Sequence, residues 1–256
     1  MRNAIAITAA SSAAVLLVAI AGCDTSRRMD NPNALQASLA GPRSVEWYEA
    51  RPSVLRARAD NGRGRIWTLH VDGVDLYDAA SDAKLRSISL PDWMWAGALH
   101  SCPPDLAIGP AGEVLVSSNV IPVLWRIDPA SYQVSRHELA ADAHGGREIG
   151  FSGLTYSAQQ GAFFAVNGLD GSLWRIDASL TRAQNIPLSE PIRRACGLSV
   201  KSPAKSRMGA FCVQAEVRDW IVNLAPDYRS AYAQPAACST RELAPTAQLR
   251  TSQKTF

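Results

Sequence analysis

The sequence lacks the short motifs that mark the commonest cofactor sites and catalytic centres. It contains no Cys-x-x-Cys or Cys-x-x-Cys-His spacing, which argues against structural zinc and covalently attached haem. It also contains no Gly-x-Ser-x-Gly elbow and no glycine-rich phosphate loop, the signatures of serine hydrolases and nucleotide-binding proteins. Its formal net charge is only +3 over 256 residues, so the composition gives no sign of a basic surface for nucleic acid.

A pentapeptide that occurs twice organises the chain. Leu124-Trp125-Arg126-Ile127-Asp128 returns as Leu173-Trp174-Arg175-Ile176-Asp177, and degenerate copies lie before and after it at Asp75–Asp78 and Trp220–Asn223. The spacing is roughly 45–50 residues, and with strand-like content that period is typical of propellers and other repeat arrays.

Each repeat divides into four short apolar or alternating segments separated by turn residues. The motif falls at the end of the third segment, where its Trp and Ile point to one face and its Asp begins the next turn. The sequence therefore predicts an all-β fold, a β-propeller of about four four-stranded blades over residues 51–234. A further blade hidden in residues 41–60 and 235–256 is the alternative. We also expect a strand near Val45–Ala50 that pairs with the last blade and removes a free edge.

The N-terminus has the features of an export signal. Arg2 precedes an apolar run, Ala4–Ala21, that is rich in alanine and small polar residues, as in a cleaved signal peptide rather than a permanent membrane span. Ile20-Ala21-Gly22-Cys23 resembles the bacterial lipobox, which implies cleavage before Cys23 and lipid attachment to its thiol. Several acyl chains on one residue hold a protein stably at a membrane. The alternative is an ordinary signal peptide with a fortuitous cysteine.

The lipobox and the repeats together divide the chain into a signal peptide (residues 1–22), a lipidated tether (23–50), the propeller and a C-terminal tail (235–256). Asp24 follows the lipidated position and resembles the signal that retains enteric lipoproteins in the inner membrane. We therefore expect the protein on the periplasmic face of a bacterial membrane, with the inner membrane slightly favoured.

Four oxygen-bearing side chains align at the loops between the second and third strands, and such side chains around an axis suit Ca²⁺: Asp72, Asn119, Asn167 and Glu216. Hairpin turns require the same residue types. The repeat pattern resembles the YVTN, NHL and SMP-30 group of β-propeller proteins over about residues 51–234. SMP-30-like enzymes carry an Asn/Asp/Glu cluster at such a place, so the resemblance implies a metal-dependent lactonase. The acidic ligand that these enzymes have at the start of the first strand is missing.

Loops between blades share the face of these four residues and hold the candidate partner or ligand site. Trp93-Met94-Trp95 is more apolar than a turn requires. Exposed, it would anchor a protein partner; buried, it would plug the central channel. His100 and His144 would face the central opening as acid or base, or bind an anion together with Arg147.

Cysteine content indicates an oxidising compartment. Four cysteines, an even number, remain after lipidation of Cys23, which favours disulfides. Cys196 and Cys212 flank a predicted hairpin and would lie opposite each other at a spacing that suits a disulfide. By elimination, Cys102 would pair with Cys238.

Together these features predict a membrane-anchored periplasmic lipoprotein whose propeller is a non-catalytic binding or scaffold module for an envelope protein. No cofactor is expected, although Ca²⁺ remains an option, and no nucleic acid partner is expected. The main alternative is a Ca²⁺-dependent, SMP-30-like lactonase that uses Asn119, Asn167 and a central carboxylate. Sensing of a small molecule in the channel is a third hypothesis.

Overall fold

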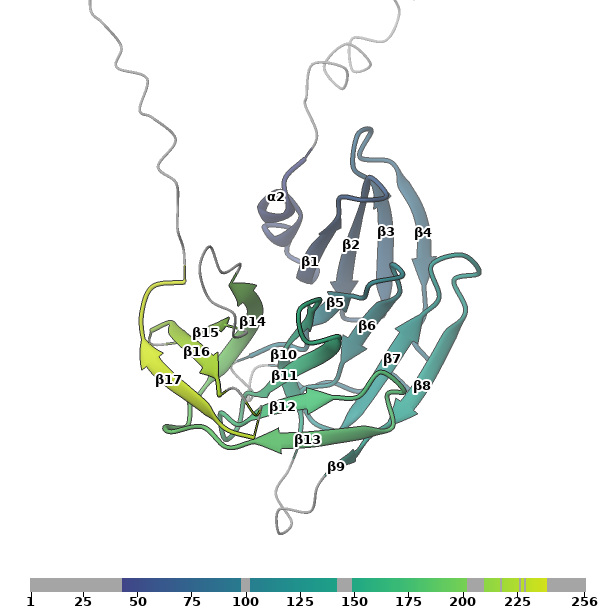
Figure 1. Ribbon diagram of the computed structural model, residues 1–256. Helices are drawn as coiled ribbons and strands as arrows, with labels where there is room; N and C mark the ends of the chain where they lie inside the picture. The colour runs from purple at the N-terminus through teal and green to yellow at the C-terminus, as the bar shows by residue number, and fades with distance from the viewer. Residues whose placement is uncertain are drawn as a thin grey trace, which may run out of the picture. The chain divides into compact units, whose positions relative to one another are not determined.

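The computed structural model describes residues 43–97, 102–141, 149–201, 210–216, 218–225, 227 and 229–238. All of them belong to one compact unit, residues 41–256. They form four sheets, each built on four antiparallel strands in their order along the chain, and the third sheet has the short β9 (Ala140–Ala141) as an added edge strand. The sheets are the blades of a four-bladed β-propeller (Figure 1).

Each blade is an antiparallel meander. The first blade consists of β1 (Val54–Asp60), β2 (Arg65–His70), β3 (Val74–Asp78) and β4 (Lys84–Ile88). The second consists of β5 (Leu106–Ile108), β6 (Val114–Ser117), β7 (Val123–Ile127) and β8 (Val134–Glu138). The third consists of β10 (Phe151–Ser157), β11 (Ala162–Asn167), β12 (Leu173–Ile176), β13 (Arg182–Ile186) and, parallel to β13, the short β9 (Ala140–Ala141). The fourth consists of β14 (Ala195–Lys201), β15 (Ala210–Ala215), β16 (Trp220–Leu224) and β17 (Ala231–Pro235). The all-β propeller predicted from the repeats is confirmed.

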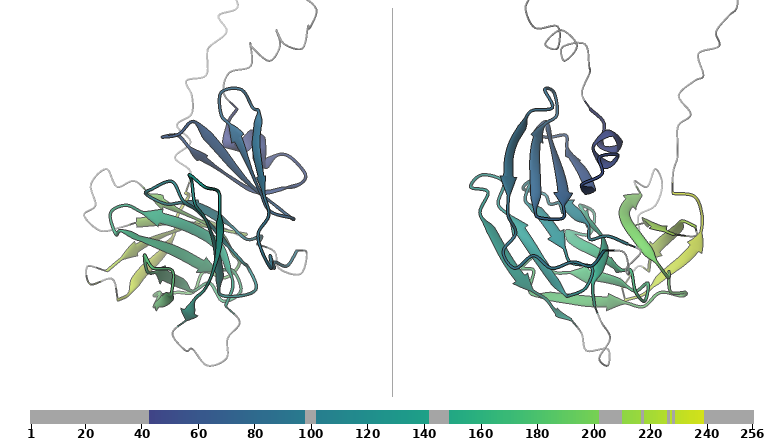
Figure 2. Two further views of the ribbon diagram at one scale, coloured as in Figure 1. Left: turned by 90° about the vertical axis from the view of Figure 1, so that its right-hand side faces the viewer. Right: turned by 180° about the vertical axis from the view of Figure 1, so that it is seen from behind.

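The first strand of each blade lies nearest the centre (Figures 1 and 2). β1 contacts β5, β5 contacts β10, and β10 contacts β14. Contacts between the inner strands therefore connect all four blades.

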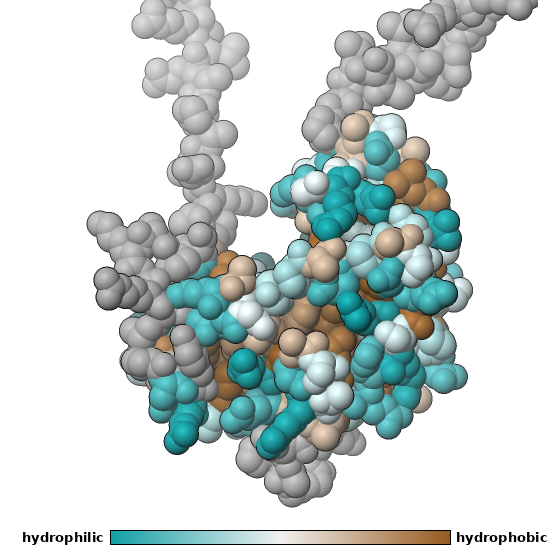
Figure 3. Space-filling model, turned by 45° about the vertical axis from the view of Figure 1, so that its right-hand side comes forward, coloured by the Kyte–Doolittle hydropathy of each residue, from teal (hydrophilic) through white to brown (hydrophobic). Residues whose placement is uncertain are grey.

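Tryptophans of the repeat fill the space between blades. Trp125 lies in the apolar cluster between the first two blades, Trp174 in the cluster between the second and third, and Trp220 in the cluster between the third and fourth. Arg126, next to Trp125 in the motif, points the other way and is exposed. The structural interpretation of the motif is thus confirmed. Figure 3 shows hydrophobic residues gathered near the middle of one face and hydrophilic residues around them.

The aspartate that ends the motif organises the following turn. In Asp128, Oδ1 accepts hydrogen bonds from the amides of Ala130 (3.0 Å) and Ser131 (2.7 Å) and from the Ser131 hydroxyl (2.9 Å). Asp78 accepts the same set of bonds in the first blade. A short carboxylate side chain holds its own turn in this way, as the sequence predicts.

Helix α2 (Val45–Glu49) occupies the segment where the sequence predicted a strand, so that prediction was wrong. A strand would place Trp47 and Tyr48 on opposite faces. The helical turn instead buries Tyr48 completely against the first blade, where its hydroxyl donates to Asp82 at 2.6 Å. Trp47 stacks under the guanidinium of Arg51 at 4.0 Å. The described residues contain no fifth four-stranded sheet, and none of their helices has the length and apolar character needed to cross a bilayer.

Both predicted disulfide pairings were wrong, although all four cysteines form disulfides. Cys102 pairs with Cys196, and Cys212 pairs with Cys238. The register explains the error, because Ser199 rather than Cys196 lies opposite Cys212, and a bulge at the start of β14 displaces Cys196 from the regular pairing. The first disulfide ties the connection between the first two blades to the inner strand of the fourth.

Candidate functional site

The chain topology gathers two kinds of loop at one end of the propeller, here called the loop face. In an antiparallel meander, the turn from the second to the third strand lies at the same end as the connection from the fourth strand to the next blade. The loop face therefore contains residues 71–73, 118–122, 168–172, 216 and 218–219 together with the described parts of the connections between blades. Of the described residues of the predicted partner and metal sites, Asp72, Trp93, Trp95, Asn119 and Glu216 belong to these segments, and Asn167 is the last residue of β11 next to them.

Both tryptophans of the predicted partner loop are half-buried and hydrogen-bonded to one atom. The indole nitrogens of Trp93 and Trp95 donate to the Val71 carbonyl, at 3.0 and 3.2 Å. Trp93 also meets Trp125 edge to face, with ring centroids 5.0 Å apart. The tryptophans thus fix the loop to the first two blades. They are not fully exposed, as an anchor for a partner would be.

The backbone of the same loop is held from below by two side chains of the second blade. The Ser118 hydroxyl donates to the Met94 carbonyl at 2.7 Å. Asn119 is buried and pairs with Ala96 through both ends of its amide: Nδ2 donates to the Ala96 carbonyl (2.8 Å) and Oδ1 accepts from the Ala96 amide (2.9 Å). Nδ2 also donates to the Cys102 carbonyl at 3.0 Å. These contacts hold the backbone and both indoles of the loop over residues 93–96.

This fixed loop leaves two apolar side chains in solvent. Met94 is 52% exposed, and Val71, whose carbonyl receives both indoles, is 50% exposed. We call these two residues the Val71–Met94 patch. The sequence predicted that the aromatic residues of this loop form the contact surface. In the structure, the exposed apolar side chains are instead Met94, between the two tryptophans, and Val71, beside them.

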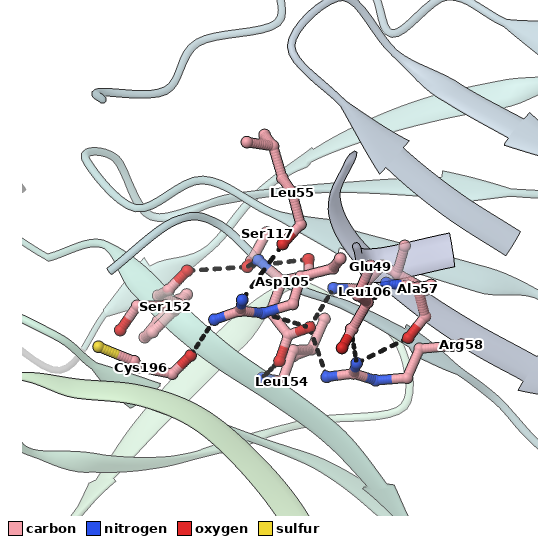
Figure 4. A network of polar contacts seen from close by, with 12 residues as sticks. Glu49, Leu55, Ala57, Arg58, Asp105, Leu106, Ser117, Ser152, Leu154 and Cys196 are labelled. Carbon is pink, nitrogen blue, oxygen red and sulfur yellow. Dashed lines mark hydrogen bonds and ion pairs between the residues drawn. The ribbon is translucent and has the colours of Figure 1, made fainter. Parts of the chain in front are cut away.

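A second group of polar residues joins the inner strands at the centre (Figure 4). Asp105 is completely buried just before β5. Its Oδ1 accepts hydrogen bonds from the Arg58 guanidinium (2.7 Å) and the Leu106 amide (2.8 Å), and its Oδ2 accepts one from the Leu154 amide (3.0 Å). Arg56 lies 3.7 Å from the same carboxylate and donates to the Cys196 carbonyl on β14. One carboxylate and two arginines thereby link all four blades.

Serine hydroxyls extend this central network. Ser117 donates to the Phe151 carbonyl at 2.8 Å and accepts from the Asp105 amide at 3.1 Å, which joins the second and third blades. Ser152 donates to the Ala195 carbonyl and so joins the third and fourth blades. Glu49 lies 3.5 Å from the Arg58 guanidinium. Because its charged groups pair with one another and its hydroxyls bond to the backbone of neighbouring strands, the network is suited to holding the strands together.

Sequence reasoning missed the central network. Its strongest signal was the pair Arg56 and Arg58, which stand two apart in one strand and therefore point to the same side. Asp105 alone carried no signal, because a carboxylate before a strand usually belongs to a solvated turn.

The four predicted metal ligands make other contacts in the structure. Asn119 holds the loop, and Oδ1 of the buried Asn167 accepts the Leu169 amide at 2.9 Å. Glu216 forms an ion pair with Arg194 at 2.6 Å, and Asp72 is exposed. Within the described ranges, no three or more His, Cys, Asp or Glu side chains gather as a metal centre would require. These contacts do not test binding by asparagine oxygens, so the Ca²⁺ site stays a prediction.

Four other predicted residues lie outside the described ranges: Cys23, His100, His144 and Arg147. The lipidation site and the histidine-containing part of the partner site therefore stay predictions. Trp93 and Trp95 are the described members of that site, and the structure brings them together on the Val71 carbonyl.

Comparisons with known proteins support the fold alone. The sequence matches no protein-family model and no protein of curated function. The structure resembles virginiamycin B lyase from Staphylococcus aureus with a TM-score of 0.52 and 14% identity, over 72% of this chain and 55% of that one. This chain thus spans about half the length of that protein.

Two further structures show weaker likeness. The allergen Mala s 1 of Malassezia sympodialis has a TM-score of 0.44 and 10% identity, over 72% of this chain and 78% of that one. An auxiliary nutrient binding protein of Bacteroides thetaiotaomicron has a TM-score of 0.48 and 8% identity, over 72% and 41% of the two chains. A shared propeller fold does not carry an activity from one protein to another.

Proposed function

We propose that this protein is a lipid-anchored lipoprotein of the bacterial envelope whose propeller is a non-catalytic binding or scaffold module for a protein partner. The observation that carries the proposal is the Val71–Met94 patch on a loop fixed by its own tryptophans. Methionine and tryptophan are enriched where proteins meet, and a rigid loop loses little conformational entropy on binding.

The place of the protein in the cell rests on separate observations. The segment Ile20-Ala21-Gly22-Cys23 resembles a lipobox, and two disulfides join described cysteines. Disulfides persist in the periplasm and not in the bacterial cytosol. Both features support a propeller held on the periplasmic side of a membrane through Cys23, with Asp24 favouring the inner membrane.

Site-specific photo-crosslinking tests the partner proposal. A photoreactive amino acid at position 94 should give a discrete adduct with one envelope protein. The matched control is position 85, because Leu85 on β4 is 51% exposed and Met94 is 52% exposed. Equal crosslinking from both positions, or none from position 94, would contradict the proposal.

Membrane fractionation of cells that express the full chain tests the anchor. The protein should sediment with membranes and incorporate labelled palmitate, and Cys23→Ser should abolish both while Asp24→Ser retains them. Release of the native protein into the soluble periplasmic fraction would show that the N-terminal segment is an ordinary signal peptide.

A further inference from the structure

Among the described residues, no apolar cluster joins the first blade to the fourth, so one face of the first blade lacks the packing between blades that the others have. Along the repeat, Asp75 stands where the next two blades have Trp125 and Trp174, which are buried against the blade before them. Part of this face is apolar and is covered by Tyr48 of α2. The part around Asp75 is polar.

Side chains from three strands meet on this polar part. The pairing Thr68–Asp75–Ser87 runs straight across β2, β3 and β4. Asp75 accepts hydrogen bonds from Lys84 Nζ (2.7 Å) and the Ser87 hydroxyl (2.6 Å). His70 Nε2 lies 3.4 Å from the same carboxylate and 2.8 Å from Thr68 Oγ1.

The carboxylate and the imidazole at the centre of this cluster are largely buried, while Lys84 and Ser87 lie at its exposed edge. The side chains of Asp75 and His70 are 13% and 12% exposed, and His70 Nδ1 contacts the Ser53 carbonyl at 3.1 Å. Burial raises the pKa of Asp75, but hydrogen bonds from Lys84 and Ser87 and the charge of His70 outweigh it, so its pKa lies below the usual range. The carboxylate therefore stays ionised and keeps its neighbours oriented.

A cleft of about 390 Å³ opens over this cluster, which is the lower end of the range for small-molecule sites. Its walls carry donors and acceptors of several kinds. Among the lining residues, those that matter here are Arg51, Ser53, His70, Asp75, Tyr77 and Lys84.

The cations that line the cleft are already paired. Lys84 is bound to Asp75, and Arg51 lies 3.3 Å from Asp82. A charged ligand would compete with these existing ion pairs. The carboxylate of Asp72 is exposed at the rim, where solvent and salt screen it. The ammonium of Lys84 and the guanidinium of Arg51 still have N–H groups beyond those used in the described contacts.

We propose that this cleft binds a small neutral molecule rich in hydroxyl groups, a monosaccharide being the simplest example. Each hydroxyl both donates and accepts hydrogen bonds. It can therefore accept from the spare N–H groups and donate to the serine oxygens and the rim carboxylate. No ion pair has to break. This site lies on the first blade and borders the Val71–Met94 patch at Val71, but the polar residues that would bind the ligand are not part of that patch, and the variants below leave Val71 and Met94 unchanged.

Ligand-observed NMR titration of the purified protein with D-glucose, D-galactose and N-acetyl-D-glucosamine tests the proposal. At least one should bind saturably. His70→Gln and Lys84→Met should each weaken that binding by about tenfold or more, because a hydrogen bond to a charged or buried group is lost. The control is His137→Gln on β8, which should bind as the native protein does.

Far-ultraviolet circular dichroism and thermal unfolding of each variant separate a lost site from a lost fold. Absence of saturable binding by all three sugars to the native protein overturns the proposal. So does binding that both cleft variants retain. Acetate or methylammonium binding that these variants abolish, with no sugar binding, overturns the neutral class of ligand.

Discussion

Arg58 on β1 donates to the buried carboxylate of Asp105 at 2.7 Å, and through this contact the first strand of the molecule is tied to the second blade. The same carboxylate accepts the Leu154 amide of the third blade, while Arg56 reaches the Cys196 carbonyl of the fourth. A four-bladed propeller has few blade contacts, so this single acidic side chain has a large share in holding the inner strands together.

Replacement of Asp105 by Asn should therefore strongly destabilise the protein. The change keeps the size of the side chain but leaves Arg56 and Arg58 without their buried counter-charge, at an expected cost of about 3 kcal/mol or more. Urea unfolding measures the difference. Asp72→Asn, at an exposed position, should change stability by less than about 0.5 kcal/mol. Equal effects of the two changes would show that the central network has no special role.

The repeat tryptophans should contribute more to the free energy of unfolding than tryptophans elsewhere in the chain. Trp174 is buried between the second and third blades, so Trp174→Ala should cost roughly 3–5 kcal/mol through lost burial and the cavity left behind. Trp47, which lies partly exposed under Arg51, should cost far less on the same change. Calorimetric melting of both variants tests this ranking, and a smaller loss for Trp174 would contradict the interblade role of the motif.

The two disulfides should differ in how much they stabilise the fold. Cys102–Cys196 spans 94 residues and Cys212–Cys238 spans 26. On chain-entropy grounds the longer loop should contribute about 1 kcal/mol more. Removing each pair with two serines avoids a free thiol, and denaturant unfolding compares the two double variants. A larger loss from the short-range pair would indicate that the long-range pair does not hold the blades.

Acid should weaken the turn after the repeat motif in the third blade. Burial raises the pKa of Asp177, but hydrogen bonds from the Ser179 hydroxyl, the Arg182 amide and Thr181 outweigh it and hold the pKa at about 2. Because the folded pKa lies below the ordinary value of 3.8, the turn contributes its stability above pH ~4 and loses it as the pH falls towards ~2.

Thermal unfolding between pH ~2 and ~5 checks this dependence. Asp177→Asn should lower the melting temperature at neutral pH and lose less stability than the native protein on acidification. The exposed location of this turn means that the effect is small. An unchanged acid dependence in the variant would show that another carboxylate is responsible.

The repeat made the fold predictable, because the same Trp and Asp perform the same tasks in successive blades. The first blade departs from it, since Asp75 replaces a tryptophan where no blade precedes. The disulfides were not predictable from hairpin symmetry, because a bulge at Cys196 shifts the register. Helix α2 was missed because five residues are too few to show a period, and only the burial of Tyr48 decides between helix and strand.

The sequence identified an unusual loop but not the contacts that hold it. The unusual content of Trp93-Met94-Trp95 identified the loop, but no sequence pattern shows that both indoles bond to the Val71 carbonyl. Asn119 lies in the turn after β6, where its amide holds Ala96, and its predicted role as a metal ligand stays a prediction. A turn residue, a loop clamp and a metal ligand have the same appearance in the sequence.

The most direct test of the binding role compares two charge insertions in the membrane-anchored protein. Met94→Asp and Leu85→Asp alter equally exposed apolar residues, one in the patch and one on the outer strand β4. Affinity for the crosslinked partner, measured by calorimetry, should fall at least about tenfold for Met94→Asp and stay unchanged for Leu85→Asp. Equal affinity of the Met94 variant and the native protein would contradict the account.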